Sequence, residues 1–165
     1  MVETYRCKGC GYLHVGPAPE VCPVCGAPSS FFLPYAAAGD ISGSTTFENL
    51  KAAFAGESQA NRRYTLWAAI ARLEGNEEAA AAFDHAAAEE TAHALGHLAY
   101  MNGFGTTAEN LRAAADGENY ETVDMYPSFA ETAEAEGFTD IAHYFRAVGS
   151  YERQHRDRYI KALGE

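Results

Sequence analysis

The chain has 165 residues, of which 47% are hydrophobic and 21% charged, which suits one ordinary domain with a buried core plus a small appendage. Its formal net charge of -11 argues against nucleic acid or an anionic membrane surface as a partner, because both require basic patches. The apolar runs are short or interrupted by charged residues, so we expect no membrane-spanning helix. The start of the chain lacks the pattern of an export signal, and a cytoplasmic location is therefore predicted.

The cysteines form two Cys-x-x-Cys pairs with eleven residues between the pairs. They are Cys7, Cys10, Cys22 and Cys25. A glycine after each pair permits a tight turn whose backbone N–H groups point at the sulfur atoms, and two such turns can close a tetrahedral four-thiolate metal site. This donor set suits zinc and iron equally, so a structural zinc ribbon and an iron site both stay open. Disulfide pairing is less favoured, because Cys-x-x-Cys loops are tight and the expected compartment is reducing.

The cysteine-rich segment has too few apolar residues to fold without a metal, so we expect metal binding and folding to be coupled there. Pro28, Pro34 and the stretch 36–44, rich in Ala, Gly and Ser, indicate the end of this module and a flexible linker. The predicted division is a metal-binding domain at 1–38, a linker at 39–44 and a helical domain at 45–165.

Helical periodicity and capping residues predict four long helices after the linker. They span about 45–74, 77–102, 106–136 and 139–163. Pro127 lies inside the third helix and predicts a kink or a local break near Met125 and Tyr126. The two halves repeat one another, because a Gly-Glu pair precedes a tyrosine by seven residues in the first half and by eight in the second. We interpret this repeat as a duplicated helical hairpin.

Each half contains a Glu-x-x-His motif, formed by Glu90 with His93 and by Glu152 with His155. Positions i and i+3 share one face of a helix, so each motif presents an oxygen and a nitrogen ligand in the same direction. Two such helices, with glutamates from two more helices, form the ligand set of a di-iron or di-manganese carboxylate centre in a four-helix bundle. Carboxylate oxygens with two imidazoles favour iron or manganese over a soft metal.

Three further glutamates complete the predicted ligand set. They are Glu57, Glu118 and Glu121. A single glutamate on a helix is more commonly solvated than a ligand, so the prediction depends on the combination of residues at similar depth in four helices. Tyr64 and Tyr126 lie about two helical turns beyond the first glutamate of each half. We interpret them as hydrogen-bond donors to the carboxylates, with core packing as the alternative.

Several motifs together resemble the rubrerythrin family over nearly the whole chain. They are Phe-Ala-Gly-Glu-Ser-Gln-Ala at 54–60, the two Glu-x-x-His motifs, Gly-Glu-Asn-Tyr-Glu at 117–121, Met-Tyr-Pro at 125–127 and the rubredoxin-like Cys-x-x-Cys pairs. In the common form of the family the rubredoxin-like module follows the bundle, whereas here it comes first. This order is similar to that of reverse rubrerythrin.

The resemblance implies an all-α four-helix bundle of the ferritin-like type, preceded by a small rubredoxin-like metal-binding domain. It implies a non-haem peroxidase that reduces hydrogen peroxide to water in oxidative-stress defence, with a di-iron centre, an Fe(SCys)4 iron that relays single electrons and an NAD(P)H-dependent flavoprotein reductase as donor. The implied di-iron ligands are Glu57, Glu90, His93, Glu118, Glu121, Glu152 and His155, and the four cysteines hold the other iron. One iron is expected to move between His93 and Glu121 when its oxidation state changes.

Two other functions stay open at this point. An oxidase that reduces O2 would use the same site. An iron-binding protein of ferritin type would combine the helical site with a structural zinc ribbon. Colour separates this last function from a peroxidase, because oxidised Fe(SCys)4 is red and a zinc ribbon is colourless.

The short connection between the second and third helices predicts a dimer. A ferritin-like bundle needs these helices parallel, so the connection must return along a helix of about 26 residues, roughly 39 Å long. The connector 103–106 reaches at most about 14 Å. We therefore predict a domain-swapped homodimer in which each di-iron site draws ligands from both chains. A simple up-down-up-down bundle within one chain is the alternative.

Overall fold

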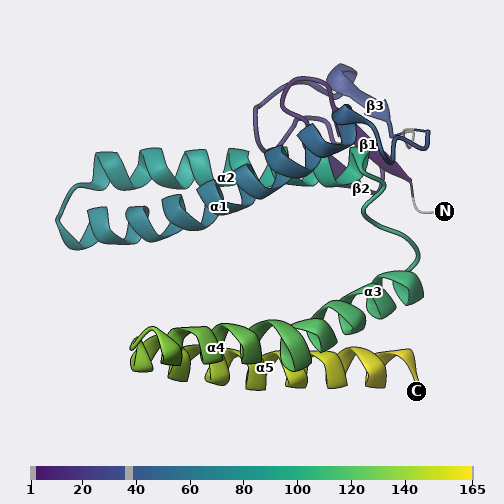
Figure 1. Cartoon of the computed structure of the whole chain (residues 1–165). Coiled ribbons are helices and arrows are strands. Elements are labelled where there is room, and N and C mark those ends of the chain that lie inside the picture. Colours follow the sequence, from purple (N-terminus) through teal and green to yellow (C-terminus); the bar gives the residue numbers. More distant parts are fainter. Residues whose placement is uncertain (1–2, 36–38, 165) are drawn as a thin grey trace. The chain divides into compact units, whose positions relative to one another are not determined.

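The computed structural model describes residues 3–35 and 39–164, and they form two compact units that divide after Gly103. The first unit contains the cysteine-rich module and one helical hairpin, and the second contains another hairpin (Figure 1). The domain boundary predicted at residue 38, and the start of the stretch at 36–38, lie outside the described residues.

A small antiparallel sheet builds the cysteine-rich module. Its strands are β1 (Thr4–Cys7), β2 (Leu13–Val15) and β3 (Phe32–Pro34), in the order β2-β1-β3, and a 3-10 turn, η1 (Ser29–Phe31), leads into β3. The buried centre consists of Cys7, Cys22 and Phe32. Only one of these is a large hydrocarbon side chain, so the module lacks the apolar burial that a domain of this size needs.

The module packs against the end of α2 (Glu77–Tyr100). The Tyr35 hydroxyl donates a hydrogen bond of 2.5 Å to the carbonyl oxygen of Ala99. The Arg6 guanidinium lies 5.2 Å from the centre of the Tyr100 ring, a cation–π distance. These contacts hold the sheet on the last turn of the helix.

The first hairpin pairs α1 (Thr45–Leu73) with α2, side by side in Figure 1. Both helices begin at a residue typical of an N-cap: the Ser44 hydroxyl accepts from the N–H of Phe47 at 3.1 Å, and the Asn76 amide oxygen accepts from the N–H of Ala79 at 3.0 Å. Gly75, with φ +77°, ends the first helix in the left-handed region that favours glycine. The first two predicted helices are therefore confirmed.

The second hairpin pairs α3 (Thr107–Tyr120), a π-helical segment η2 (Glu121–Met125) and α4 (Tyr126–Ala135) with α5 (Thr139–Leu163). Thr106 and Glu109 form a reciprocal capping box at the start of α3. The break predicted near Met125 and Tyr126 is confirmed, and it takes the form of a π segment that ends at Met125, directly before α4 begins. Together with the first hairpin, these elements confirm the predicted class of a four-helix, ferritin-like protein with a rubredoxin-like domain.

The π segment explains the unequal spacing in the two halves of the sequence. Here the N–H of Tyr126 bonds to the carbonyl oxygen of Glu121, five residues back instead of four. A π turn absorbs one extra residue without ending the helix, which accounts for a spacing of eight in this half against seven in the first. Pro127 falls in the first turn of α4, where an N–H has no helical partner to lose.

Alanine dominates the interfaces inside both hairpins. The buried residues of the helices are mostly alanines, including Ala68, Ala80 and Ala142, each with 0% of its surface exposed. Large apolar side chains remain uncovered, for example Trp67 at 40% and Ile141 at 47%. Each hairpin therefore buries its small residues and leaves an apolar face that needs a further surface to cover it. Among the described residues, no helix has the length and apolar composition needed to cross a bilayer.

Metal removal tests whether the module depends on its ion. We expect a strong chelator to unfold residues 4–35 while the helices persist, because the thiolates replace most of the missing core. Amide NMR signals from the module should collapse to the unfolded range, with far-UV circular dichroism nearly unchanged. A module that keeps dispersed signals without metal would contradict this dependence.

Candidate metal centres

The four cysteine sulfur atoms already have the spacing of a tetrahedral metal site. Cys7 Sγ lies 3.8 Å from Cys25 Sγ, and Cys10 Sγ lies 3.7 Å from Cys22 Sγ. A metal bound to four sulfurs at about 2.3 Å requires sulfur–sulfur edges of about 3.8 Å. A disulfide would need about 2.05 Å, so these free cysteines are not paired with one another.

Backbone amides and burial act in opposite directions on the thiols. Burial raises the pKa of the Cys10 thiol to about 12. Burial also acts to raise the pKa of Cys22, but hydrogen bonds from the backbone of Cys25 and Val24 lower it overall. A metal must displace protons from thiols that would otherwise keep them, so metal uptake here releases protons and depends on pH.

The first hairpin brings together Glu57 from α1 with Glu90 and His93 from α2. His93 Nδ1 lies 2.9 Å from Glu90 Oε2. Two ligands at right angles on one ion, each bonded at about 2.1 Å, are about 3.0 Å apart, so this pair can chelate with little movement. A hydrogen bond shared with Glu90, then burial, then the charge of Glu90 raise the pKa of Glu57. We call these three residues the first half-site.

The second hairpin forms the matching group from Glu118 of α3 with Glu152 and His155 of α5. His155 Nδ1 lies 2.7 Å from Glu152 Oε2 and 3.7 Å from Glu118 Oε1. Burial and then the charge of Glu152 raise the pKa of Glu118. Glu118 Oε2 is buried and has no hydrogen-bond partner, which a cation at this position would supply. We call this group the second half-site.

The structure thus groups six of the seven predicted ligands into two sets of three, one in each unit. Glu121, at the first position of η2, is not part of the second set, although its charge raises the pKa of Glu118 and of Tyr126. Its role as a ligand stays a prediction. The equivalent geometry of the two half-sites follows from the same i, i+3 spacing in each repeat.

The two predicted tyrosines lie in aromatic clusters. The Tyr64 ring stacks on Phe83 at 6.1 Å, and the Tyr126 ring lies 6.1 Å from Phe145. Burial, followed by the charges of nearby carboxylates, raises the pKa of Tyr126. In the described part of the chain neither hydroxyl bonds to a ligand carboxylate, so packing is observed for both and the donor role stays a prediction.

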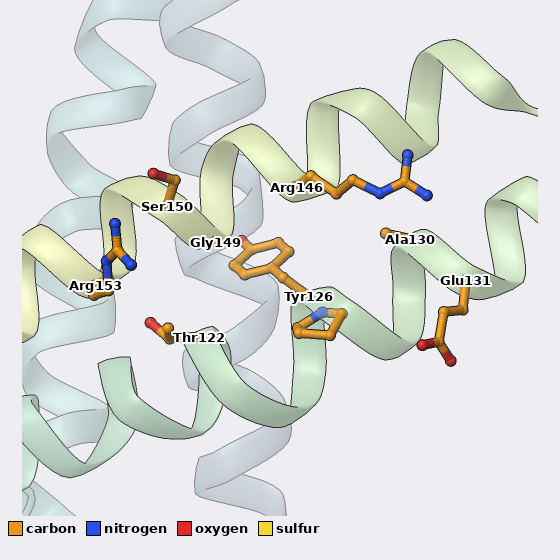
Figure 2. Close-up of a pocket in the computed structure, with 9 residues that line it drawn as sticks. Thr122, Tyr126, Ala130, Glu131, Arg146, Gly149, Ser150 and Arg153 are labelled. Atoms are coloured by element: carbon orange, nitrogen blue, oxygen red, sulfur yellow. The ribbon is translucent and has the colours of Figure 1, made fainter.

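A hollow of about 420 Å³ lies between η2, α4 and α5 of the second hairpin (Figure 2). Tyr126 occupies its middle, opposite Gly149. Thr122 and Gly149 line it one helical turn from Glu118 and Glu152 respectively, but none of the second half-site ligands does. The hollow therefore lies beside the metal ligands and is not itself the metal site.

Two residues near the first half-site make contacts that the sequence did not predict. Asn61, one turn after Glu57, is buried and bonds across to Thr91, next to Glu90. Gly96, one turn after His93, lies where an added Cβ would be 3.1 Å from the Gly11 carbonyl oxygen. In the sequence, Asn61 and Gly96 stand out because asparagine and glycine are disfavoured in the middle of a helix unless packing requires them.

Comparison with known proteins decides the family. Residues 48–163 match the family described as Rubrerythrin, and residues 5–33 match the one described as Rubrerythrin, rubredoxin-like domain. The chain belongs to the rubrerythrin family. It is 46% identical over 136 residues to the rubrerythrin of Porphyromonas gingivalis, covering 74% of this chain and 68% of that protein.

Two more distant members of the family show the range of the similarity. A putative rubrerythrin of Methanocaldococcus jannaschii is 39% identical over 73% of this chain and 70% of its own length. Reverse rubrerythrin-1 of Clostridium acetobutylicum is 32% identical over 99% of this chain and 64% of its own length.

Rubrerythrins are di-iron oxidoreductases of oxidative-stress defence, and the donor sets fit that assignment. Four thiolates at tetrahedral spacing suit one iron, and the carboxylate and imidazole half-sites suit a di-iron centre. The predicted cofactors are therefore confirmed. Membership in the family also decides between the zinc and iron alternatives for the rubredoxin-like domain in favour of iron.

Replacing Glu57 by Gln tests the electrostatic cost of the first half-site. The pKa of Glu57 is raised in the folded state, so folding without metal loses stability as pH rises from its ordinary value of 4.5 through the raised one. Metal-free Glu57→Gln should therefore be more stable than the parent by up to about 1 kcal/mol at neutral pH, with little difference in acid. Thermal unfolding across this pH range measures it.

The exposed Glu131→Gln variant provides a control, since it makes the same change of charge away from the ligands. With metal bound, Glu57→Gln should be less stable than the parent, because an amide is a poorer ligand than a carboxylate. A metal-free Glu57→Gln protein that is less stable than the parent at neutral pH would contradict the repulsion between Glu57 and Glu90.

Proposed function

We propose that this protein is a peroxidase of the reverse rubrerythrin type, which reduces hydrogen peroxide to water with electrons that pass through the rubredoxin-like iron. The observation that carries the proposal is the contact between Gly11 and Gly96. Gly11 follows the thiolate ligand Cys10, and Gly96 lies one helical turn from the ligand His93. The rubredoxin-like site thus lies against the helix that carries two of the predicted di-iron ligands, Glu90 and His93.

The chemistry requires two electrons and two protons for each peroxide, which is split into two water molecules. A di-iron centre held by the two half-sites would supply two electrons together, and an iron held by the four cysteines would supply electrons singly. The chain itself supplies the metal ligands. Burial and the charges of Glu121 and Glu152 raise the pKa of Tyr126, so its phenol stays protonated, which suits a hydrogen-bond donor beside the centre.

The order of the two domains and the similarity over 99% of the chain to a protein named reverse rubrerythrin-1 support the reverse type. An NAD(P)H-dependent flavoprotein reductase as electron donor, and a cytoplasmic location, belong to the same proposal. So does the division into domains at 1–38 and 45–165 with a linker at 39–44.

Rapid mixing of reduced, iron-loaded protein with oxidants tests the choice of substrate. We expect hydrogen peroxide to reoxidise both iron sites much faster than O2 does, with the red colour of oxidised Fe(SCys)4 returning during the reaction. Faster reoxidation by O2 would favour the oxidase instead. A colourless module that still binds two irons in the helices would favour an iron-binding protein with a zinc ribbon.

A Cys22→Ser variant tests the relay. Cys22 is one of the two fully buried sulfur ligands, so its loss should disrupt the rubredoxin-like site and slow turnover with a reductase by about tenfold or more. Iron binding in the helices should survive, because the half-site ligands are untouched, and metal analysis provides that control. Turnover equal to that of the parent would reject the relay.

The exposed apolar faces of the hairpins also support the proposed domain-swapped homodimer. The second helix has 24 residues and is about 36 Å long, whereas the six residues 101–106 reach at most about 22 Å. They cannot return along α2 to make α3 parallel to it. Two chains that exchange hairpins avoid this limit, and each di-iron centre then combines the first half-site of one chain with the second of its partner.

Mixed dimers test the exchange. Glu90→Ala destroys the first half-site and Glu152→Ala the second, so neither homodimer should hold a di-iron centre. Unfolding and refolding the two variants together should restore one centre per mixed dimer, because the intact halves meet across the chains. A bundle closed within one chain would gain nothing from mixing, and a monomeric mass with iron bound would exclude the swap.

A further inference from the structure

The alanines buried between the helices of the first hairpin contribute little to its register. Contacts of Tyr64 with Phe83 and of Arg72 with Asp84 also join the helices, but on α1 they lie about two turns or more beyond Glu57. A row of small, similar side chains gives nearly the same packing when one helix slides along the other, whereas unequal shapes would lock it. The metal ligands tolerate no such slip. A shift of one helical turn moves Glu57 by about 5.4 Å relative to Glu90, further than one ion can bridge.

Asn61 supplies a directional contact in this interface. Among the described residues it is the only polar one that is buried, with 8% of its surface exposed. Its Nδ2 donates to the carbonyl oxygen of Ala87 at 2.6 Å and to Thr91 Oγ1 at 2.8 Å, both on α2. Its Oδ1 accepts from Arg62 Nε at 2.8 Å, which holds the amide with its N–H groups toward α2.

These bonds lie at the level of the ligands. Asn61 follows Glu57 by one turn on α1, and its two acceptors on α2 stand three residues before and one residue after Glu90. Any slip between the helices would leave a buried amide unpaired, at a cost of about 1–3 kcal/mol. A single buried polar contact can define helix register in this way even when it adds no stability.

We propose that Asn61 is a positioning residue that sets the register of α1 on α2 and so holds Glu57 opposite Glu90 and His93 before metal binds. The inference concerns the metal site itself. It holds whether the oxidant is peroxide or O2.

The second hairpin provides a natural comparison. By the repeat, Asn61 corresponds to Thr122 and Thr91 corresponds to Arg153. Thr122 Oγ1 is buried without a hydrogen-bond partner, so no bond joins these two equivalent positions. The helices of the second hairpin are joined instead by an exposed bond, in which Arg156 donates to Asn119 Oδ1 at 3.0 Å. A buried amide bond between helices is thus found only at the first half-site among the described residues, and the same change in the two hairpins should have different effects.

Asn61→Leu tests the proposal, because leucine has a similar size and no polar atoms. With zinc first bound to the thiolates, Mn2+ uptake by the helical site can be followed from the loss of the free Mn2+ electron paramagnetic resonance signal. We expect Mn2+ affinity to fall by about 10- to 100-fold. Thermal stability of the metal-free protein should stay equal or rise, because an apolar side chain then fills the site.

That split between affinity and stability separates positioning from a merely structural role, in which both would fall together. Mn2+ affinity equal to the parent's would overturn the proposal, as would a loss of affinity that only parallels a loss of stability. Should Asn61→Leu fail to fold, Thr91→Val removes the acceptor hydroxyl and should weaken Mn2+ binding, and Thr91→Ser should restore it. Thr122→Val, the matched change in the second hairpin, should leave Mn2+ affinity unchanged.

Discussion

The structure depends on the close approach of acidic side chains inside a chain of net charge -11. In each hairpin two carboxylates meet beside one imidazole. A hydrogen bond shared with Glu90, followed by burial and the charge of Glu90, raises the pKa of Glu57, and burial with the charge of Glu152 raises that of Glu118. Such a group opposes folding until a cation balances it. The helices must therefore hold in place ligands that repel one another, and the other features of the fold follow from that demand.

One consequence is the unusual composition of the hairpin interfaces. Small residues let the two helices of a hairpin approach closely, so that glutamates on both can reach one ion, but alanines contribute little burial and no register. Large apolar side chains lie on the faces that remain exposed in each unit. Each hairpin on its own thus has an uncovered apolar face and only three of the candidate ligands. A second hairpin could supply both the covering surface and the further ligands.

The two halves of the repeat differ in structure beside their candidate ligands. In the first hairpin the Asn61 amide bonds across to α2 beside the ligands. In the second, a π turn begins at Glu121 and brings an additional carboxylate close enough to raise the pKa of Glu118. In the rubredoxin-like domain, two of the cysteine ligands belong to the buried centre itself. This domain approaches α2 so closely at Gly96 that a larger residue there would meet the Gly11 carbonyl oxygen.

The sequence by itself determined the four-thiolate module, the four helices and six candidate metal ligands, because Cys-x-x-Cys loops, caps and i, i+3 pairs act over a few residues. The sequence also shows that the second half has one extra residue between its glutamate and its tyrosine. It does not show that the helix absorbs this residue as a π turn instead of a kink, because that depends on what packs against the helix. Only the tertiary structure decided that Asn61 bonds to Thr91 and that Gly11 meets Gly96. Those contacts join residues 30 and 85 positions apart, and no local pattern encodes such a pairing.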